Sequence, residues 1–283
     1  MWVIGGILIY LAIKKDMEPA LLLPMGFGAI LINIPFSGAE GVMSSLFAIG
    51  IEMNEIMPLV LFIGIGAMID FGPLLSNPKL FLFGGAAQFG IFLTILLAAA
   101  CGFSIEDAAS IGIIGAADGP TSIVVAQTLK SNYVGPIMVV AYSYMALVPI
   151  IQPAVIKLTT TKKERLIRME YKPASVSKRT KILFPILVTI VSGLIAPASL
   201  SLVGMLMFGN LIRECGVLNY LTDTAKDVLT NLVTLFLGIT IAFTMKAENF
   251  ITVQTLMIMG LGLCAFIFDT FSGVMLAKVM NLF

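Results

Sequence analysis

Residues 115–124 read Gly-Ala-Ala-Asp-Gly-Pro-Thr-Ser-Ile-Val, and this stretch decides the expected fold. It places an ionisable residue, Asp118, beside the helix-interrupting pair Gly119-Pro120, within a segment apolar enough to lie in a bilayer. A carboxylate at membrane depth is costly, so it is retained mainly where it faces a partner, an ion or a water-filled cavity. Broken backbone meets the same constraint, because its free carbonyl and amide groups find no water in lipid. The stretch predicts an ion site; the alternative is a Pro-kinked structural helix with an internally satisfied Asp118.

Composition indicates an all-α polytopic membrane protein, since the 283 residues are 59% hydrophobic and 12% charged, with a mean hydropathy of +1.04. With a net charge of +1, the chain lacks the excess of positive charge that is typical of nucleic-acid-binding proteins. The chain has no histidine, and its three cysteines lie far apart. Zinc sites and histidine chemistry are therefore excluded, and any bound cation should be a hard one held by oxygen ligands, such as sodium.

Apolar stretches recur along the chain, and most of them are long enough to cross with tilt or a kink. They lie at about 2–13, 20–35, 56–70, 80–101, 105–129, 134–156, 182–195, 200–212, 228–245 and 254–281. Nine basic residues and only two acidic ones lie between Lys157 and Lys181, and we call residues 157–181 the basic loop. An excess of Lys and Arg marks cytoplasmic loops, so we expect the basic loop and Lys14-Lys15 in the cytoplasm. The segment 37–55 is interpreted as interfacial.

Counting crossings makes segment 105–129 unusual. From Lys15 inside, three segments cross in turn: 20–35, 56–70 and 80–101. Segment 134–156 must end inside at the basic loop, which works only if 105–129 does not cross. We therefore predict a re-entrant hairpin with Asp118 at its tip; a single broken spanning helix is the alternative if the interfacial segment crosses. Ser104 with Asp107 makes a cap for a first short helix, and Pro120 suits the first turn of a second.

An internal repeat supports this layout. Leu61-Phe62-Ile63-Gly64-Ile65 recurs as Leu235-Phe236-Leu237-Gly238-Ile239, and the crossing count gives the two copies opposite directions. This is the pattern of an inverted-topology repeat, with a first repeat in 1–156, the basic loop, and a second repeat in 182–283. Copying the offset places a second hairpin at about position 292, past Phe283, so the chain is expected to stop before that hairpin and to show half of the site.

Several motifs along the chain carry a family resemblance. They are Asp70-Phe71-Gly72-Pro73-Leu74-Leu75, Gln88-Phe89-Gly90, residues 111–122, residues 141–153, Lys162-Lys163-Glu164-Arg165, residues 204–211 and residues 276–283. Together they resemble the membrane β subunit of sodium-pumping biotin-dependent decarboxylases. That family includes the oxaloacetate, glutaconyl-CoA, methylmalonyl-CoA and malonate decarboxylases, and the resemblance covers essentially the whole chain.

The resemblance implies a multi-pass subunit of the cytoplasmic membrane that decarboxylates carboxybiotin, exports sodium and consumes an inward-moving proton. Its cofactors would be a sodium ion and carboxybiotin presented by a partner. Its partners would be the α subunit with biotin carrier and carboxyltransferase, a small membrane γ or δ subunit, lipid and further copies of the chain. By motif, Asp118 matches the family's sodium-site aspartate and Tyr144 its functional tyrosine. The family's other site residues, an Asn and a Ser, would lie beyond Phe283.

The candidate site residues follow from both lines of reasoning. Asp118 and Tyr144 are the predicted catalytic residues, because either could relay a proton to carboxybiotin. Sodium is assigned to Asp118, Gly119, Thr121 and Ser122, although a plain capping role for Thr121 and Ser122 is an alternative. Tyr142 is expected to pack rather than to react. Asp269, inside the last apolar stretch, is expected either to line the cavity or to make an interhelical hydrogen bond.

Two other functions stay open at this point. One is a sodium-coupled carboxylate transporter with the same repeat and no decarboxylase activity, and the other is a membrane anchor for soluble enzymes. The basic loop is first a topology determinant, and it could also dock the carrier or a partner subunit.

Overall fold

The computed structural model describes residues 1–36, 38–53, 55–167 and 176–281. Within these ranges every regular element is helical, and the predicted apolar stretches correspond to helices. The helices are α1 (Trp2–Lys15), α2 (Pro19–Ile32), α3 (Ala39–Phe47), α4 (Ile56–Met68), α5 (Gly72–Ser76), α6 (Phe81–Ala100), α7 (Ile105–Gly112), α8 (Gly119–Thr128), α9 (Val134–Thr159), α10 (Lys162–Arg165), α11 (Lys178–Ile195), α12 (Leu200–Cys215), α13 (Asn219–Asp223), α14 (Thr230–Ile241), α15 (Ala247–Phe250) and α16 (Val253–Met280). Residues 168–175 of the basic loop lie outside the described ranges.

The long helices are those of a multi-pass membrane protein. Three described stretches are long and apolar enough to cross a bilayer: Pro78–Ala100, Asn219–Thr244 and Val253–Met280. Two further pairs pass the same test together but are bent at a break, Ala39–Glu52 with Ile56–Met68 by 61° and Val134–Met145 with Ile150–Thr159 by 68°. The first of these pairs contains the segment whose interfacial placement stays a prediction.

The chain forms two compact units, each built from segments far apart in sequence. Unit 1 contains residues 1–47, 80–170 and 238–283, and unit 2 contains residues 48–79 and 171–237. The last boundary falls inside α14. Each unit therefore combines segments of both predicted repeats, whose boundaries stay a prediction.

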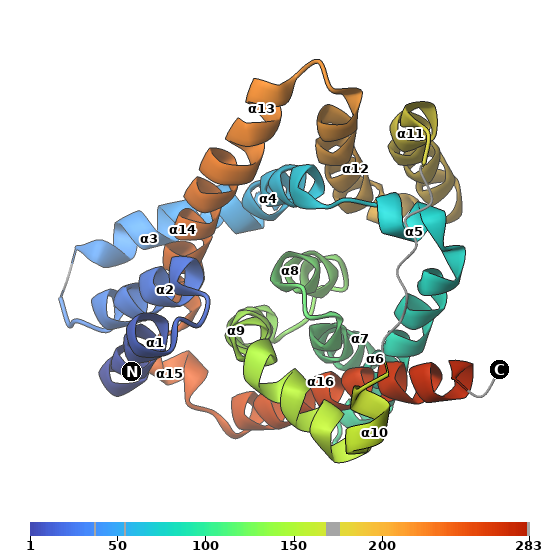
Figure 1. Ribbon diagram of the computed structural model, residues 1–283. Helices are drawn as coiled ribbons and strands as arrows, with labels where there is room; N and C mark the ends of the chain where they lie inside the picture. Colours follow the sequence, from blue (N-terminus) through green and yellow to red (C-terminus); the bar gives the residue numbers. More distant parts are fainter. Residues whose placement is uncertain (37, 54, 168–175, 282–283) are drawn as a thin grey trace. The chain divides into compact units, whose positions relative to one another are not determined.

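In unit 1 the long helices α6, α9 and α16 pack around the short helices α7 and α8 (Figure 1). All five helices supply residues to one buried cluster, including Ala98, Ile111, Ala126, Val140 and Leu261. Lipid tails are as apolar as these side chains, so close packing rather than a hydrophobic driving force between helices stabilises such a core. The cluster fixes α7 and α8 against three long helices.

In unit 2 glycines let α4 and α12 approach backbone to backbone. A Cβ on Gly66 would overlap the carbonyl of Leu206, and one on Gly209 would overlap the carbonyl of Ile63. Small residues at this spacing are typical of tightly packed membrane helices. The buried Asn210 amide adds an interhelical hydrogen bond to the carbonyl of Ile69 at 2.9 Å.

The same order of elements occurs in both halves of the chain. A short helix, a π-helical segment and a long apolar helix follow one another as α3, Ala48–Glu52 and α4, and again as α13, Thr224–Leu229 and α14. A long helix follows each series, α6 in the first half and α16 in the second. This order agrees with an internal repeat, and the inverted relation of the two copies stays a prediction.

Candidate functional site

The break between α7 and α8 follows from its sequence. Ser104 caps α7 by accepting the Asp107 N–H at 3.1 Å, as the S-x-x-D pattern predicts. After a short 3₁₀ segment, Ala117 takes a left-handed backbone with φ 56° and Asp118 is extended. Helix α8 then starts at Gly119 with Pro120 in its first turn, also as predicted. Two short helices therefore meet at Asp118.

The ends of α7 and α8 that lie away from Asp118 are joined by the buried carboxylate of Asp107. It accepts hydrogen bonds from the Ser131 hydroxyl at 2.7 Å and from the Asn132 backbone and side-chain amides at 2.8 and 3.2 Å. Hydrogen bonds to a charged group contribute about 1.5–3 kcal/mol each. The first turn of α7 thus lies beside the chain leaving α8, and the pair forms a helical hairpin with Asp118 at its far end. That this hairpin is re-entrant in the membrane stays a prediction.

Asp118 is half-buried at the N-terminus of α8. The Thr121 hydroxyl donates a hydrogen bond to the Asp118 carboxylate, and the Ser122 hydroxyl donates to the Asp118 backbone carbonyl at 3.0 Å. Asp118 is the N-cap residue of α8, and its side chain makes no capping hydrogen bond to the helix backbone. Of the predicted sodium ligands, the Thr121 hydroxyl therefore lies beside the Asp118 carboxylate, and the Ser122 hydroxyl is bonded to the Asp118 backbone carbonyl.

The donor chemistry of the break fits a hard monovalent cation. Its groups are oxygens: one carboxylate, hydroxyls and the carbonyls that end the first half of the hairpin. Those carbonyls carry partial negative charge, and the amides that start α8 carry partial positive charge. Within the described part of the chain, no group of three or more His, Cys, Asp or Glu side chains is placed to hold a metal ion. A single carboxylate suits sodium better than a divalent ion that needs several.

Tyr144 lies on α9 and turns toward α16. Its hydroxyl donates to the carbonyl of Met259 at 2.5 Å, and its ring packs edge-on against Phe266 with centroids 5.7 Å apart. The side chain belongs to the buried cluster of unit 1. The hydroxyl of the tyrosine predicted to be catalytic is therefore bonded to α16.

Asp269 lies on α16 and packs against two glycines. A Cβ on Gly115 would come 2.5 Å from its Oδ2, and one on Gly90 would overlap its Oδ1. The Oδ1 atom is buried and accepts no hydrogen bond from any described residue. Since Gly115 precedes Asp118 by three residues, Asp269 approaches the backbone just before the break.

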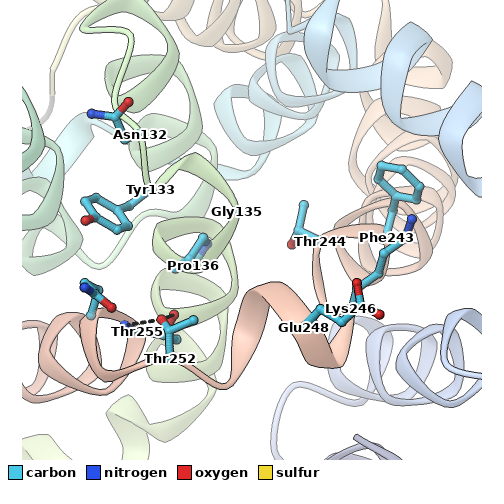
Figure 2. Close-up of a pocket in the computed structure, with 11 residues that line it drawn as sticks. Asn132, Tyr133, Gly135, Pro136, Phe243, Thr244, Lys246, Glu248, Thr252 and Thr255 are labelled. Atoms are coloured by element: carbon cyan, nitrogen blue, oxygen red, sulfur yellow. Dashed lines mark hydrogen bonds between the residues drawn. The ribbon is translucent and has the colours of Figure 1, made fainter.

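A cavity of unit 1 lies at the end of the hairpin away from Asp118. It has a volume of about 500 Å³ and is lined by α9, α16 and the segment between α14 and α16. Figure 2 shows Asn132 and Tyr133 on one side of it and Thr244, Lys246 and Glu248 on the other. Lys246 also forms an ion pair with Glu40, which does not line this cavity. The lining of the cavity thus carries both signs of charge, from Lys246 and Glu248.

Comparison with known protein families assigns the chain to one of them. The model of the Na⁺-transporting oxaloacetate decarboxylase beta subunit family matches residues 1–283. The chain belongs to this family. The match runs from end to end, and it confirms the resemblance that the motifs predicted.

The chain is similar to beta subunits that are named for three different decarboxylases. The methylmalonyl-CoA decarboxylase subunit beta of Propionigenium modestum is 50% identical over 99% of this chain and 78% of its own length. The glutaconyl-CoA decarboxylase subunit beta of Acidaminococcus fermentans is 50% identical over 99% of this chain and 75% of its own length. The oxaloacetate decarboxylase beta chain of Klebsiella pneumoniae is 41% identical over 100% of this chain and 80% of its own length. The chain is therefore a decarboxylase beta subunit of the sodium-transporting class.

Sequence reasoning missed one residue beside the break of this decarboxylase subunit. Tyr142 was expected only to pack, yet its ring lies across Gly119, where a Cβ would come 2.5 Å from its Cζ. The two positions are on different helices, and no spacing in the sequence reports that contact. The only signal available was the small residue at 119, which admits a close neighbour.

Proposed function

We propose that this chain decarboxylates carboxybiotin and couples that reaction to sodium export with consumption of a proton, as the β subunit of a multisubunit decarboxylase pump. One observation carries the proposal: in a chain of this family, the Asp118 carboxylate is held by the Thr121 hydroxyl where the two halves of a hairpin meet. A buried polar break of this kind is the usual ion site of carriers built from broken helices.

Asp118 can alternate between holding sodium and holding a proton, which is the minimal device for exchanging one for the other. When sodium is bound, the carboxylate, the Thr121 hydroxyl and the carbonyls ending the first half of the hairpin surround it with oxygen. When sodium has left, a proton neutralises the carboxylate, and the Thr121 hydroxyl keeps its hydrogen bond. The closed hairpin end at Asp107 keeps the break at a fixed depth while the occupant changes.

Carboxybiotin, when bound, supplies an N-carboxylate that releases carbon dioxide once its ureido group receives a proton. The chain's own residues have to exclude water and deliver that proton. We assign the delivery to Asp118 and Tyr144, the second through the hydroxyl that now donates to Met259.

The proposed topology puts the basic loop in the cytoplasm of a cell whose cytoplasmic membrane holds the chain. Contacts within unit 1 support it, because they join ends that the crossing count puts on one side. Lys278, at the inner end of α16, pairs with Glu164 of the basic loop at 3.1 Å. On the outer side, the Asn33 amide donates to the carbonyl of Met245 at 2.8 Å, and its oxygen accepts the Ala247 N–H at 3.0 Å.

The proposed partners are the α subunit with biotin carrier and carboxyltransferase, a small membrane γ or δ subunit, and further copies of this chain. The basic loop is the proposed docking element for an acidic surface of the carrier or of a partner subunit, because its excess of Lys and Arg would steer such a surface toward the membrane.

The test is the sodium dependence of decarboxylation by the purified complex. We expect Asp118→Asn to lose sodium-stimulated decarboxylation, because the amide neither carries the charge that holds sodium nor takes up a proton. The matched control is Glu106→Gln, which removes an exposed carboxylate from α7 of the same hairpin. Sodium activation of Asp118→Asn equal to that of the control would contradict the proposal.

A further inference from the structure

Tyr142 is held against the ion site by α9. Its side chain is 1% exposed, and its ring covers Gly119, the residue next to Asp118. The ring edge that bears the hydroxyl is the part in contact: Cζ and Cε1 lie 2.5 Å and Cε2 lies 2.7 Å from where a Gly119 Cβ would be. Because residue 119 is a glycine and has no Cβ, the phenol ring can reach the break.

The hydroxyl of Tyr142 has no hydrogen-bond partner among the described residues. Tyrosine hydroxyls in protein interiors usually find one, because burial removes the water that would otherwise bind them. Only two other buried side-chain oxygens in the described part of the chain share this condition, Thr94 Oγ1 and Asp269 Oδ1. An unsatisfied phenol is costly to keep in a core where phenylalanine would fill the same space.

The neighbour that gives the hydroxyl a purpose is Asp118, because the hydroxyl-bearing edge of the Tyr142 ring lies on Gly119, the next residue along the chain. Tyr144, two residues further along α9, does not share this position, since residues two apart on a helix point in different directions. Its hydroxyl is already bonded to Met259. The two tyrosines therefore have separate roles, and only Tyr142 has an oxygen free at the break.

We propose that the Tyr142 hydroxyl is an oxygen ligand of the hard monovalent cation held by Asp118, and that it positions this cation between α8 and α9. A phenol oxygen has lone pairs for the cation and one proton to donate. It therefore joins the Asp118 carboxylate and the Thr121 hydroxyl in one coordination shell. When the cation leaves, the same O–H is a donor for the Asp118 carboxylate. This inference rests on the proposed function, because it takes sodium as the ion bound there.

The experiment compares Tyr142→Phe with wild type in the purified complex. The substitution keeps the ring on Gly119 and removes only the oxygen. We expect the sodium concentration for half-maximal decarboxylation to rise about tenfold, with the rate at saturating sodium changed much less. Equilibrium binding of radioactive sodium without carboxybiotin should weaken by the same factor. The control is Tyr10→Phe, whose ring is 55% exposed on α1, and it should leave both readouts unchanged.

A structural role predicts the opposite pattern. If the hydroxyl is only an unsatisfied core group, Tyr142→Phe binds sodium as wild type does and is equally or more resistant to heat, and the proposal is overturned. A wild-type complex whose decarboxylation does not depend on sodium would instead contradict the proposed function itself. Should Tyr142→Phe not assemble, 3-fluorotyrosine at position 142 retains the hydroxyl: its fluorine resonance should shift with sodium in wild type and not in Asp118→Asn, and no shift in wild type overturns the proposal.

Discussion

Replacing Gly119 with alanine perturbs the break at a single atom. The new Cβ would lie 2.5 Å from Cε1 and Cζ of Tyr142, whereas carbon atoms in ordinary contact are about 3.5–4.0 Å apart. The overlap of about 1 Å has to be relieved by moving a ring that is 1% exposed or the start of α8. Overpacking of this kind costs about 1–3 kcal/mol. We expect a fall of about 2–10 °C in the midpoint of thermal inactivation, together with weaker sodium activation because Asp118 moves with the helix start.

Thermal inactivation of the purified complex, followed by its decarboxylase activity, measures this effect. The matched control is Gly260→Ala on α16, where a Cβ meets no atom within 4 Å. Combining Gly119→Ala with Tyr142→Leu should cost less than the sum of the two single changes, since the smaller side chain makes room for the methyl group. A Gly119→Ala complex as stable as Gly260→Ala, with normal sodium activation, would refute the placement of the Tyr142 ring on the break.

Two further predictions concern other parts of the molecule. Gly209→Ala should destabilise unit 2 by about 1–3 kcal/mol, because the new Cβ overlaps a carbonyl of α4. Gly204→Ala, on the same helix with its nearest neighbour 4.0 Å away, should not, and equal thermal inactivation of the two variants would be the wrong result. At the basic loop, the Thr161 N–H and then Lys278 hold the pKa of Glu164 below its usual 4.5. A depressed folded pKa gives stability that is present above the unfolded pKa and is lost as pH falls, so exchange protection of α10, corrected for intrinsic rates, should drop between about pH 5.5 and about pH 3.5. Glu164→Ala should be equally unprotected across that range, and a variant whose exchange protection drops with pH as in wild type would contradict this role.

The sequence predicted those parts of the fold that depend on local spacing. Apolar length located the helices, and Ser104 and Pro120 marked the start of each half of the hairpin, because caps and proline act within one turn. Asp118 stood out for the same reason, as a carboxylate beside a helix breaker.

The contacts that close the site lie beyond local spacing. Asp107 was predicted as a cap, and the structure adds its bonds to Ser131 and Asn132, more than twenty residues away. The ring of Tyr142 on Gly119 joins two helices whose packing angle no pattern specifies. Ser122 was expected as a ligand or a cap, which stays a prediction; the structure adds a hydrogen bond from its hydroxyl to the carbonyl one turn back, an option open to any serine in a helix. Such choices depend on tertiary packing, which decides between partners of similar energy.

The central claim is that sodium movement and decarboxylation share Asp118. The most direct measurement reconstitutes the subunit in liposomes with free carboxybiotin and records carbon dioxide release and radioactive sodium flux in the same sample, for wild type and Asp118→Asn. The account predicts that sodium stimulates release in wild type and that Asp118→Asn loses release and flux together. Sodium flux that is indifferent to carboxybiotin, or an Asp118→Asn subunit that keeps both activities, would contradict it.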